Sequence, residues 1–300
     1  MKRTKIAFAA LMFTMVVSVL SCKKDSNTNN DADTDVSGAS DNALAENTSN
    51  DIVSIASQSA DNTSLTLSTF RSSDPSEDLS SCATVSRDTV TKIVTVTFNN
   101  STCVDGRTRN GSLVFNYSAS TNGAVHYRDP GFTCSVTSNN YIVDGNQVSI
   151  LSKTITNTTP VGFNPASTNE TWNITANISI VKASGATVSW TCNRVKTLLN
   201  TSTTYTDAAT PIDWHNARIG ITGTANGTRA NGETFTANVT SQLIRDFGGC
   251  NINGRHPFIQ GTLTYSPTGK ATRYFDYGSG TCDLDATVTI NGVPHPITLP

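Results

Sequence analysis

The feature that most constrains the fold is a two-residue alternation of apolar and polar side chains, which begins near residue 84. In Thr89–Phe98, the side chains of Val90, Val94, Val96 and Phe98 share one face, and the threonines of the segment share the other. Successive side chains of a strand point to opposite faces of a sheet, so the pattern predicts a strand with one buried and one solvated face. Similar runs follow at residues 112–118, 141–151, 172–181, 187–195, 218–224, 234–243, 258–265, 272–277 and 286–290.

Short turn sequences separate these runs. Asn291-Gly292 lies between two alternating segments and predicts a two-residue hairpin, because both residues tolerate positive φ. Further turn signals lie at residues 122–123, 144–145, 184–185, 231–232 and 267–269. Since no helical pattern stands between the runs, an antiparallel sheet is favoured over a parallel one. We therefore predict a mainly β fold, an antiparallel meander or sandwich-like sheet over residues 61–300.

One segment of the chain has a helical period instead. The positions that recur with this spacing are Leu44, Thr48, Ile52, Ile55, Ala56 and Ser59. Ser40 or Asp41 is suited to cap the first turn. This pattern predicts one N-terminal α-helix over residues 41–60, which would lay a narrow apolar stripe on the sheet.

Two segments of the strand region echo each other. "DGRTRNGSLVFNY" at residues 105–117 and "NGTRANGETFTAN" at residues 226–238 both place Thr-Arg in a turn before Asn-Gly and a strand. Two related meanders would explain the echo, and so would the ordinary preferences of hairpins. Both explanations stay open on the sequence alone.

The first residues have the features of an export signal. Lys2, Arg3 and Lys5 precede a mostly apolar run at residues 6–20, which is short of the ~20 residues that a helix needs to span a bilayer. The run ends in Leu20-Ser21-Cys22, which resembles the lipobox of bacterial lipoproteins. The resemblance implies that residues 1–21 are a signal peptide and that Cys22 carries lipid. A plain secretory signal and a signal anchor are the alternatives.

The resemblance also implies where the chain resides. Attachment through two or more acyl chains is stable, so the membrane itself is an expected partner. Residue 23 is Lys rather than Asp, which favours the outer membrane by analogy with lipoprotein sorting in Gram-negative bacteria. The face of that membrane, periplasmic or external, stays open. Residues 22–40 are rich in Asn, Ser and Asp and predict a disordered tether.

The number of cysteines fits an exported chain. If lipid occupies Cys22, six cysteines remain, an even number that predicts a disulfide framework. Their positions suggest the pairs Cys82–Cys103, Cys134–Cys192 and Cys250–Cys282, among the 15 pairings that six cysteines allow. Free thiols and zinc ligation are the alternatives, and the absence of any Cys-x-x-Cys spacing argues against zinc.

Charge and composition exclude one class of partner. The formal net charge of −2 becomes −5 when the three basic residues of the signal are removed. A mildly acidic chain without a basic cluster is a poor binder of nucleic acid, and we predict no nucleic-acid partner.

Three segments of the chain resemble a known group of proteins. "FNNSTCVDGRTRNGSLVFNYS", "NYIVDGNQVS" and "FDYGSGTCDLDATVTINGVPHPITL" are similar to uncharacterised cell-envelope lipoproteins of Bacteroidetes, over roughly residues 41–300. The chain departs from that group at Val293-Pro294-His295-Pro296, where two prolines suit an edge strand. The resemblance implies an anchored β domain and supplies no activity.

Sequence motifs of catalysis are missing. The chain has no Gly-x-Ser-x-Gly, His-Glu-x-x-His, Walker or dinucleotide glycine motif, so we predict no catalytic residue, cofactor or metal. The densest polar-aromatic cluster is Asp213, Trp214 and His215, a weak candidate for a ligand site. Asp246 and Asp276 are candidates for a carboxylate pair only because nothing excludes them.

Four aromatic residues fall in the segment that spans two adjacent runs, namely Tyr265, Tyr274, Phe275 and Tyr277. They could form a platform for stacking sugars, but core packing is the favoured interpretation. The expected function is therefore that of a lipid-anchored envelope protein with a structural, adhesive or ligand-binding role, with a glycan or an envelope protein as a possible partner. The alternative is a hydrolase that uses loop aspartates and His215 on an envelope polymer.

Overall fold

The computed structural model describes residues 35–61, 82–210, 212–213, 216–252 and 256–299. In these residues, thirteen strands form one antiparallel sheet, and each strand pairs with its neighbours in sequence from β1 to β13. The strands are β1 Ala83–Asp88, β2 Ile93–Thr102, β3 Thr108–Asn116, β4 Thr133–Val143, β5 Asn146–Asn157, β6 Glu170–Val181, β7 Thr187–Leu198, β8 Arg218–Thr228, β9 Thr234–Asp246, β10 Gln260–Pro267, β11 Arg273–Ser279, β12 Asp285–Ile290 and β13 Val293–Thr298. The predicted mainly β, antiparallel fold is confirmed.

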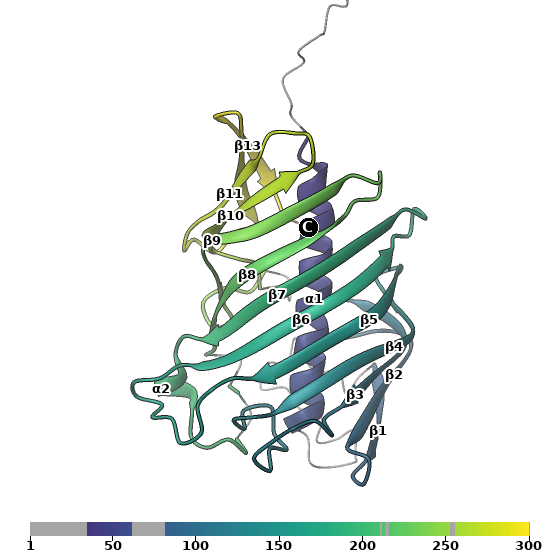
Figure 1. Cartoon of the computed structure of the whole chain (residues 1–300), viewed down its shortest axis with the longest axis vertical. Helices are drawn as coiled ribbons and strands as arrows, with labels where there is room; N and C mark the ends of the chain where they lie inside the picture. Colours follow the sequence, from purple (N-terminus) through teal and green to yellow (C-terminus); the bar gives the residue numbers. More distant parts are fainter. Residues whose placement is uncertain (1–34, 62–81, 211, 214–215, 253–255, 300) are drawn as a thin grey trace, which may run out of the picture. The chain divides into compact units, whose positions relative to one another are not determined.

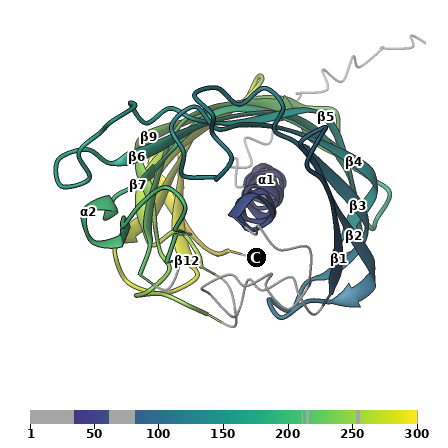
Figure 2. The same cartoon turned by 90° about the horizontal axis from the view of Figure 1, so that it is seen from below.

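The sheet curls around a single long helix, α1 (Ser37–Asp61), which lies against its concave face (Figures 1 and 2). A second helix of four residues, α2 (Thr201–Thr204), follows β7. The chain from Asp33 to Pro300 groups into one unit, so the sheet is continuous across both halves of the sequence echo. The predicted N-terminal helix is therefore confirmed, and its partner is the whole curved sheet rather than one flat face.

Several element boundaries differ from those predicted; the run predicted at residues 141–151, for example, covers the end of β4, the turn at residues 144–145 and the start of β5. α1 begins at Ser37, inside the segment predicted to be a disordered tether, because Asp35 accepts the Ser37 N–H at 2.9 Å and pairs with Arg229 and Lys270 of the sheet. The strand predicted from residue 89 begins at Ile93, since residues 89–92 form the turn between β1 and β2. Residues 1–34, which hold the predicted signal peptide and Cys22, lie outside the described residues.

The predicted Asn-Gly hairpin is confirmed. Asn291 and Gly292 join β12 to β13 with φ of 52° and 80°, the left-handed conformation that a tight hairpin turn requires. Among the described strands, β13 pairs with β12 alone, so it is an edge strand of the sheet. Pro294 and Pro296 are tolerated there because no further strand needs their missing N–H groups.

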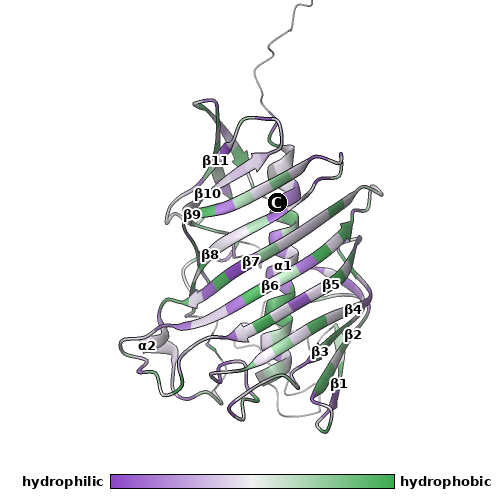
Figure 3. Cartoon of the chain, in the orientation of Figure 1, coloured by the Kyte–Doolittle hydropathy of each residue, from purple (hydrophilic) through white to green (hydrophobic). Residues whose placement is uncertain are grey.

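The concave face of the sheet carries the core. Apolar and polar positions alternate along the strands (Figure 3), and the side chains of Trp172 and Trp190 at the centre are fully buried. On the opposite, convex face the strand register aligns hydroxyl and amide side chains in a row. This row runs through Ser135, Thr154, Thr175, Asn193, Thr224, Asn238 and Thr264.

Two of the three predicted disulfides are present, Cys82–Cys103 and Cys250–Cys282. The third prediction, Cys134–Cys192, is wrong, because both cysteines are free and buried. Cys134 lies on β4 and Cys192 on β7, so β5 and β6 stand between them. Three strand intervals of about 4.8 Å separate their backbones by about 14 Å, whereas a disulfide requires Cα atoms within about 7 Å.

Candidate functional site

The helix that the sheet surrounds is polar on most of its sides. Eight of its polar side chains are buried, namely Asp41, Asn42, Glu46, Thr48, Ser49, Ser57, Gln58 and Ser59. A buried polar group is costly unless it forms hydrogen bonds, so these residues need partners on the concave face of the sheet. The strands supply such partners to Asn42, Glu46 and Ser49, as tryptophan, arginine and lysine side chains.

Ion pairs hold α1 at successive points along its length. Asp41 pairs with Lys182 at 2.6 Å, in the turn after β6, and Glu46 pairs with Arg194 of β7 at 2.7 Å. Between them, the indole N–H of Trp190 donates to the Asn42 side chain at 3.1 Å. Because these carboxylates are buried, each ion pair requires its partner to remain in place.

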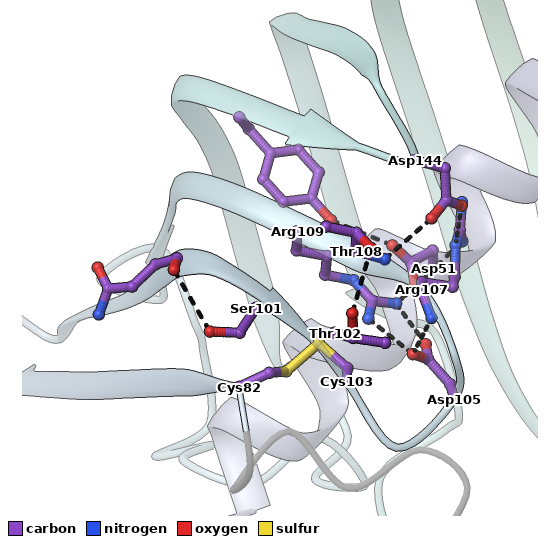
Figure 4. Close-up of a disulfide and its surroundings, with 12 residues drawn as sticks. Asp51, Cys82, Ser101, Thr102, Cys103, Asp105, Arg107, Thr108, Arg109 and Asp144 are labelled. Carbon is purple, nitrogen blue, oxygen red and sulfur yellow. Dashed lines mark hydrogen bonds and ion pairs between the residues drawn. A yellow bond between two sulfur atoms is a disulfide. The ribbon is translucent and has the colours of Figure 1, made fainter.

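The next acid of the helix, Asp51, lies in a cluster of five charged residues (Figure 4). Arg109 contacts both Asp51 and Asp105 at 2.5 Å, and Arg107 contacts Asp51 at 3.4 Å and Asp144 at 2.9 Å. Burial alone would raise the pKa of Asp51, but the charges of Arg109 and Arg107 hold it below its ordinary value. The cluster therefore keeps Asp51 ionised at neutral pH.

The Cys82–Cys103 disulfide lies beside this charge cluster (Figure 4). Cys103 donates its N–H to the Arg107 carbonyl at 2.9 Å and so closes the tight connection between β2 and β3. The disulfide thus fixes the backbone that presents Arg107 and Arg109 to the helix.

A buried lysine stands at the centre of the concave face. Lys153 of β5 is 2% exposed, and its ammonium donates to the Ser49 hydroxyl of α1 at 2.7 Å. Burial lowers the pKa of Lys153 to about 8 and raises the pKa values of the nearby Cys134 and Cys192 thiols to about 12 and about 11. Such thiols hold their protons at neutral pH and are poor nucleophiles.

A cavity of about 290 Å³ lies between α1 and the concave face of the sheet. Much of its wall is apolar and comes from β8 to β11 and the segment before β10. The apolar residues of this wall include Ile221, Leu243, Phe258, Leu263 and Tyr277, and Val53 faces them from α1. Ligand sites in proteins are typically cavities of ~300–1,000 Å³ with an apolar lining and a few polar groups, so this cavity is the candidate functional site.

The polar part of the cavity wall presents hydrogen-bond donors. Lys196 lies over the rings of Tyr127 and Trp172 at 5.6 and 5.7 Å. The guanidinium of Arg245 lies over the Phe258 ring at 4.9 Å and donates to Asn47 at 3.3 Å.

A third donor of this wall comes from α1. The side-chain amide nitrogen of Asn50 is buried and has no hydrogen-bond partner. The cavity thus combines an apolar wall with donors that can meet the acceptor atoms of a ligand.

Asp246 and Asp276, the candidates for a carboxylate pair, do not line the cavity. Asp246 accepts the Gly249 N–H at 2.7 Å and Asp276 accepts the Gly278 N–H at 2.9 Å, so each carboxylate caps its own local turn. Among the residues that the structure describes, no group of three or more His, Cys, Asp and Glu side chains is placed to hold a metal ion.

Among the described helices, none is long and apolar enough to cross a bilayer.

The predicted Asp213 cluster is only partly described. Asp213 accepts a hydrogen bond from the Asn216 side chain at 2.7 Å, and Trp214 and His215 lie outside the described residues. One His–Asp contact does occur, where Asp129 lies 3.2 Å from the His126 ring. The same carboxylate oxygen accepts the backbone N–H groups of Val125 and His126, so it stabilises a turn.

The predicted aromatic segment divides between the two faces of the sheet. Tyr265, Phe275 and Tyr277 are buried on the concave face, and Tyr274 is 57% exposed. The preference for core packing over a sugar-stacking platform is confirmed for three of the four residues. Tyr277 belongs to the cavity wall, which the sequence did not indicate.

The sequence analysis did not predict the cavity or the ion pairs, although the two-residue alternation contains a signal for them. In β7, Arg194 and Lys196 occupy the inward positions of the alternation, in line with Trp190 and Cys192. A charged residue at an apolar position indicates that a polar element packs there. The echoed Thr-Arg segments share this role, because Arg109 contacts Asp51 and Arg229 contacts Asp41 at 3.8 Å.

Comparison of the chain with protein-family models, with curated proteins and with solved structures finds no match in any of the three.

Proposed function

We propose that this protein is a lipid-anchored protein of the bacterial outer membrane that binds a small ligand in the cavity between α1 and the sheet. The observation that carries the binding role is the cavity itself, whose lining combines apolar side chains with the hydrogen-bond donors of Asn50, Lys196 and Arg245. The Leu20-Ser21-Cys22 motif supports the anchor at Cys22. The role is non-enzymatic, because the candidate aspartates serve local turns.

Native mass spectrometry of the purified full chain tests the binding role. Protein isolated under mild conditions should carry a small-molecule adduct that disappears on denaturation. The Val53→Phe variant should lose the adduct, because the larger side chain occupies the cavity from α1. Val195→Phe is the matched control, since Val195 is exposed on the convex face of β7. An adduct kept equally by both variants would contradict a site in this cavity.

The anchor is tested separately in cells. Cells fed radiolabelled palmitate should label the wild-type chain, and Cys22→Ser should abolish the label and the membrane association. Processing of the wild-type chain should also stop when globomycin inhibits the lipoprotein signal peptidase. Processing that continues in its presence would contradict lipidation at Cys22.

A further inference from the structure

The chemistry of the cavity wall narrows the class of ligand, an inference that rests on the binding role proposed above. Leu243, Leu263 and Phe258 form an apolar surface on one side. A ligand that fills this part must expose hydrocarbon, because a polar group placed there would lose its hydrogen bonds to water.

The polar residues of the cavity lining favour an acceptor. The Asn50 amide nitrogen is a buried donor with no hydrogen-bond partner, and a buried unsatisfied donor is costly. Lys196 of β7 and Arg245 of β9 add two positive charges to the lining, and Arg245 also lies over the Phe258 ring. A ligand group that accepts hydrogen bonds and carries negative charge would satisfy the Asn50 donor and be attracted by both cations.

The acids that line the cavity do not oppose such a ligand, because arginines contact them. Glu46 pairs with Arg194, and Asp51 and Asp105 both pair with Arg109. Asp144 pairs with Arg107 in the same cluster. The negative charges of the lining are therefore balanced at short range.

The volume of the cavity indicates how many ligand atoms it can enclose. At about 30 Å³ for each water-sized group, 290 Å³ holds about ten non-hydrogen atoms. A carboxylate with an alkyl chain of about eight carbons has this size. We propose that the cavity binds an amphipathic medium-chain carboxylate, with its alkyl chain against Leu243, Leu263 and Phe258 and its carboxylate near Asn50, Lys196 and Arg245.

Isothermal titration calorimetry of the full chain with three eight-carbon probes tests this proposal. Octanoate should bind, 1-octanol should bind at least tenfold more weakly, and octyltrimethylammonium should not bind. Octanol or the cationic probe binding as tightly as octanoate would overturn the assignment of the carboxylate.

Variants at Asn50 locate the carboxylate. Asn50→Asp places a negative charge at the donor position and should weaken octanoate binding at least tenfold. Asn50→Leu removes a donor that has no partner, so it breaks no existing hydrogen bond of that nitrogen, and it should weaken octanoate but not octanol. Asn193→Asp is the matched control, because Asn193 is exposed on the convex face of β7, and it should bind octanoate like the wild type. Asn50→Leu that binds octanoate as the wild type does would contradict the proposed position.

The outcome separates the ligand class from the binding role. If no eight-carbon probe binds but the native adduct still depends on Val53, the ligand class is wrong and the binding site stands. If that adduct is absent as well, both are wrong.

Discussion

At the scale of single residues, Lys153 shows what it costs to place a charge inside the curved sheet. Its pKa of about 8 lies below the ~10.4 of an exposed lysine because burial disfavours the ammonium. Between these two values the unfolded chain binds more protons than the folded chain, so the free energy of unfolding rises with pH in that window. Below about pH 8 both states are protonated, and the folded state carries the full cost.

Replacement of Lys153 by Met tests this account. The contribution of Lys153 to wild-type stability should rise by about 3 kcal/mol between pH 8 and pH 10.4, so the difference in stability between the wild type and Lys153→Met should change by about this amount. At pH 7 the variant should be more stable by about 1–2 kcal/mol, because the relief of desolvation exceeds the loss of the Ser49 hydrogen bond. Urea unfolding across pH measures both effects. Lys92→Met, in the exposed turn before β2, is the control that should keep the pH dependence.

The two free cysteines provide a second prediction for single residues. Maleimide should label neither Cys134 nor Cys192 in the folded protein, since both are buried and burial raises their pKa values. In denaturant without a reducing agent, mass spectrometry should count two labels on the described part of the chain. If the chain accepts these labels only after reduction, Cys134 and Cys192 form the third disulfide.

At the scale of elements, α1 is a helix held by charge as much as by apolar packing. Ala45, Ile52, Ile55 and Ala56 pack in the core, as the predicted stripe requires. The acids Asp41, Glu46 and Asp51 recur every five residues and so point in three different directions around the helix axis. These three carboxylates can all reach partners on one sheet because the sheet curves around the helix.

Loss of one buried ion pair of α1 should have a large effect. Glu46→Ala leaves Arg194 buried without its acid and should lower the free energy of unfolding by about 3–5 kcal/mol. The double variant Glu46→Leu with Arg194→Met removes both charges and should recover most of that loss. Chemical denaturation measures each variant. If the double variant is no more stable than Glu46→Ala, the attraction between Glu46 and Arg194 outweighs the cost of burying their two charges.

The sequence predicted the elements better than their arrangement. Period-two alternation and Asn-Gly turns gave the strands and hairpins because these signals are local, as Asn291-Gly292 shows. Strand β1 was missed because its inward positions are too weakly apolar to show the alternation. The curvature of the sheet depends on contacts between distant residues, such as Arg194 with Glu46, so the cavity and the free state of Cys134 could not be predicted.

At the scale of the whole molecule, α1 connects parts of the sheet that are far apart in sequence. Its middle contacts β3 through Asp51, and its first turns contact the turn between β8 and β9 through Asp41. One hydrophobic core includes residues from α1 and from strands near both edges, such as Val94 and Val288. The two halves of the sequence echo should therefore unfold together rather than as separate meanders.

Hydrogen exchange of the Asp51→Asn variant distinguishes a sheet that unfolds as one unit from two meanders that unfold independently. Asp51 contacts residues of the first half only, namely Arg107, Arg109 and Tyr141. The substitution removes one of the two carboxylates that pair with Arg109, and Asp105 remains, so it should lower the free energy of unfolding by about 1.5–3 kcal/mol. If the sheet unfolds as one unit, the slowest amides of β3 and of β11 should lose protection by the same amount. A loss confined to β2–β4 would instead show that the two meanders unfold independently, and that α1 does not couple them.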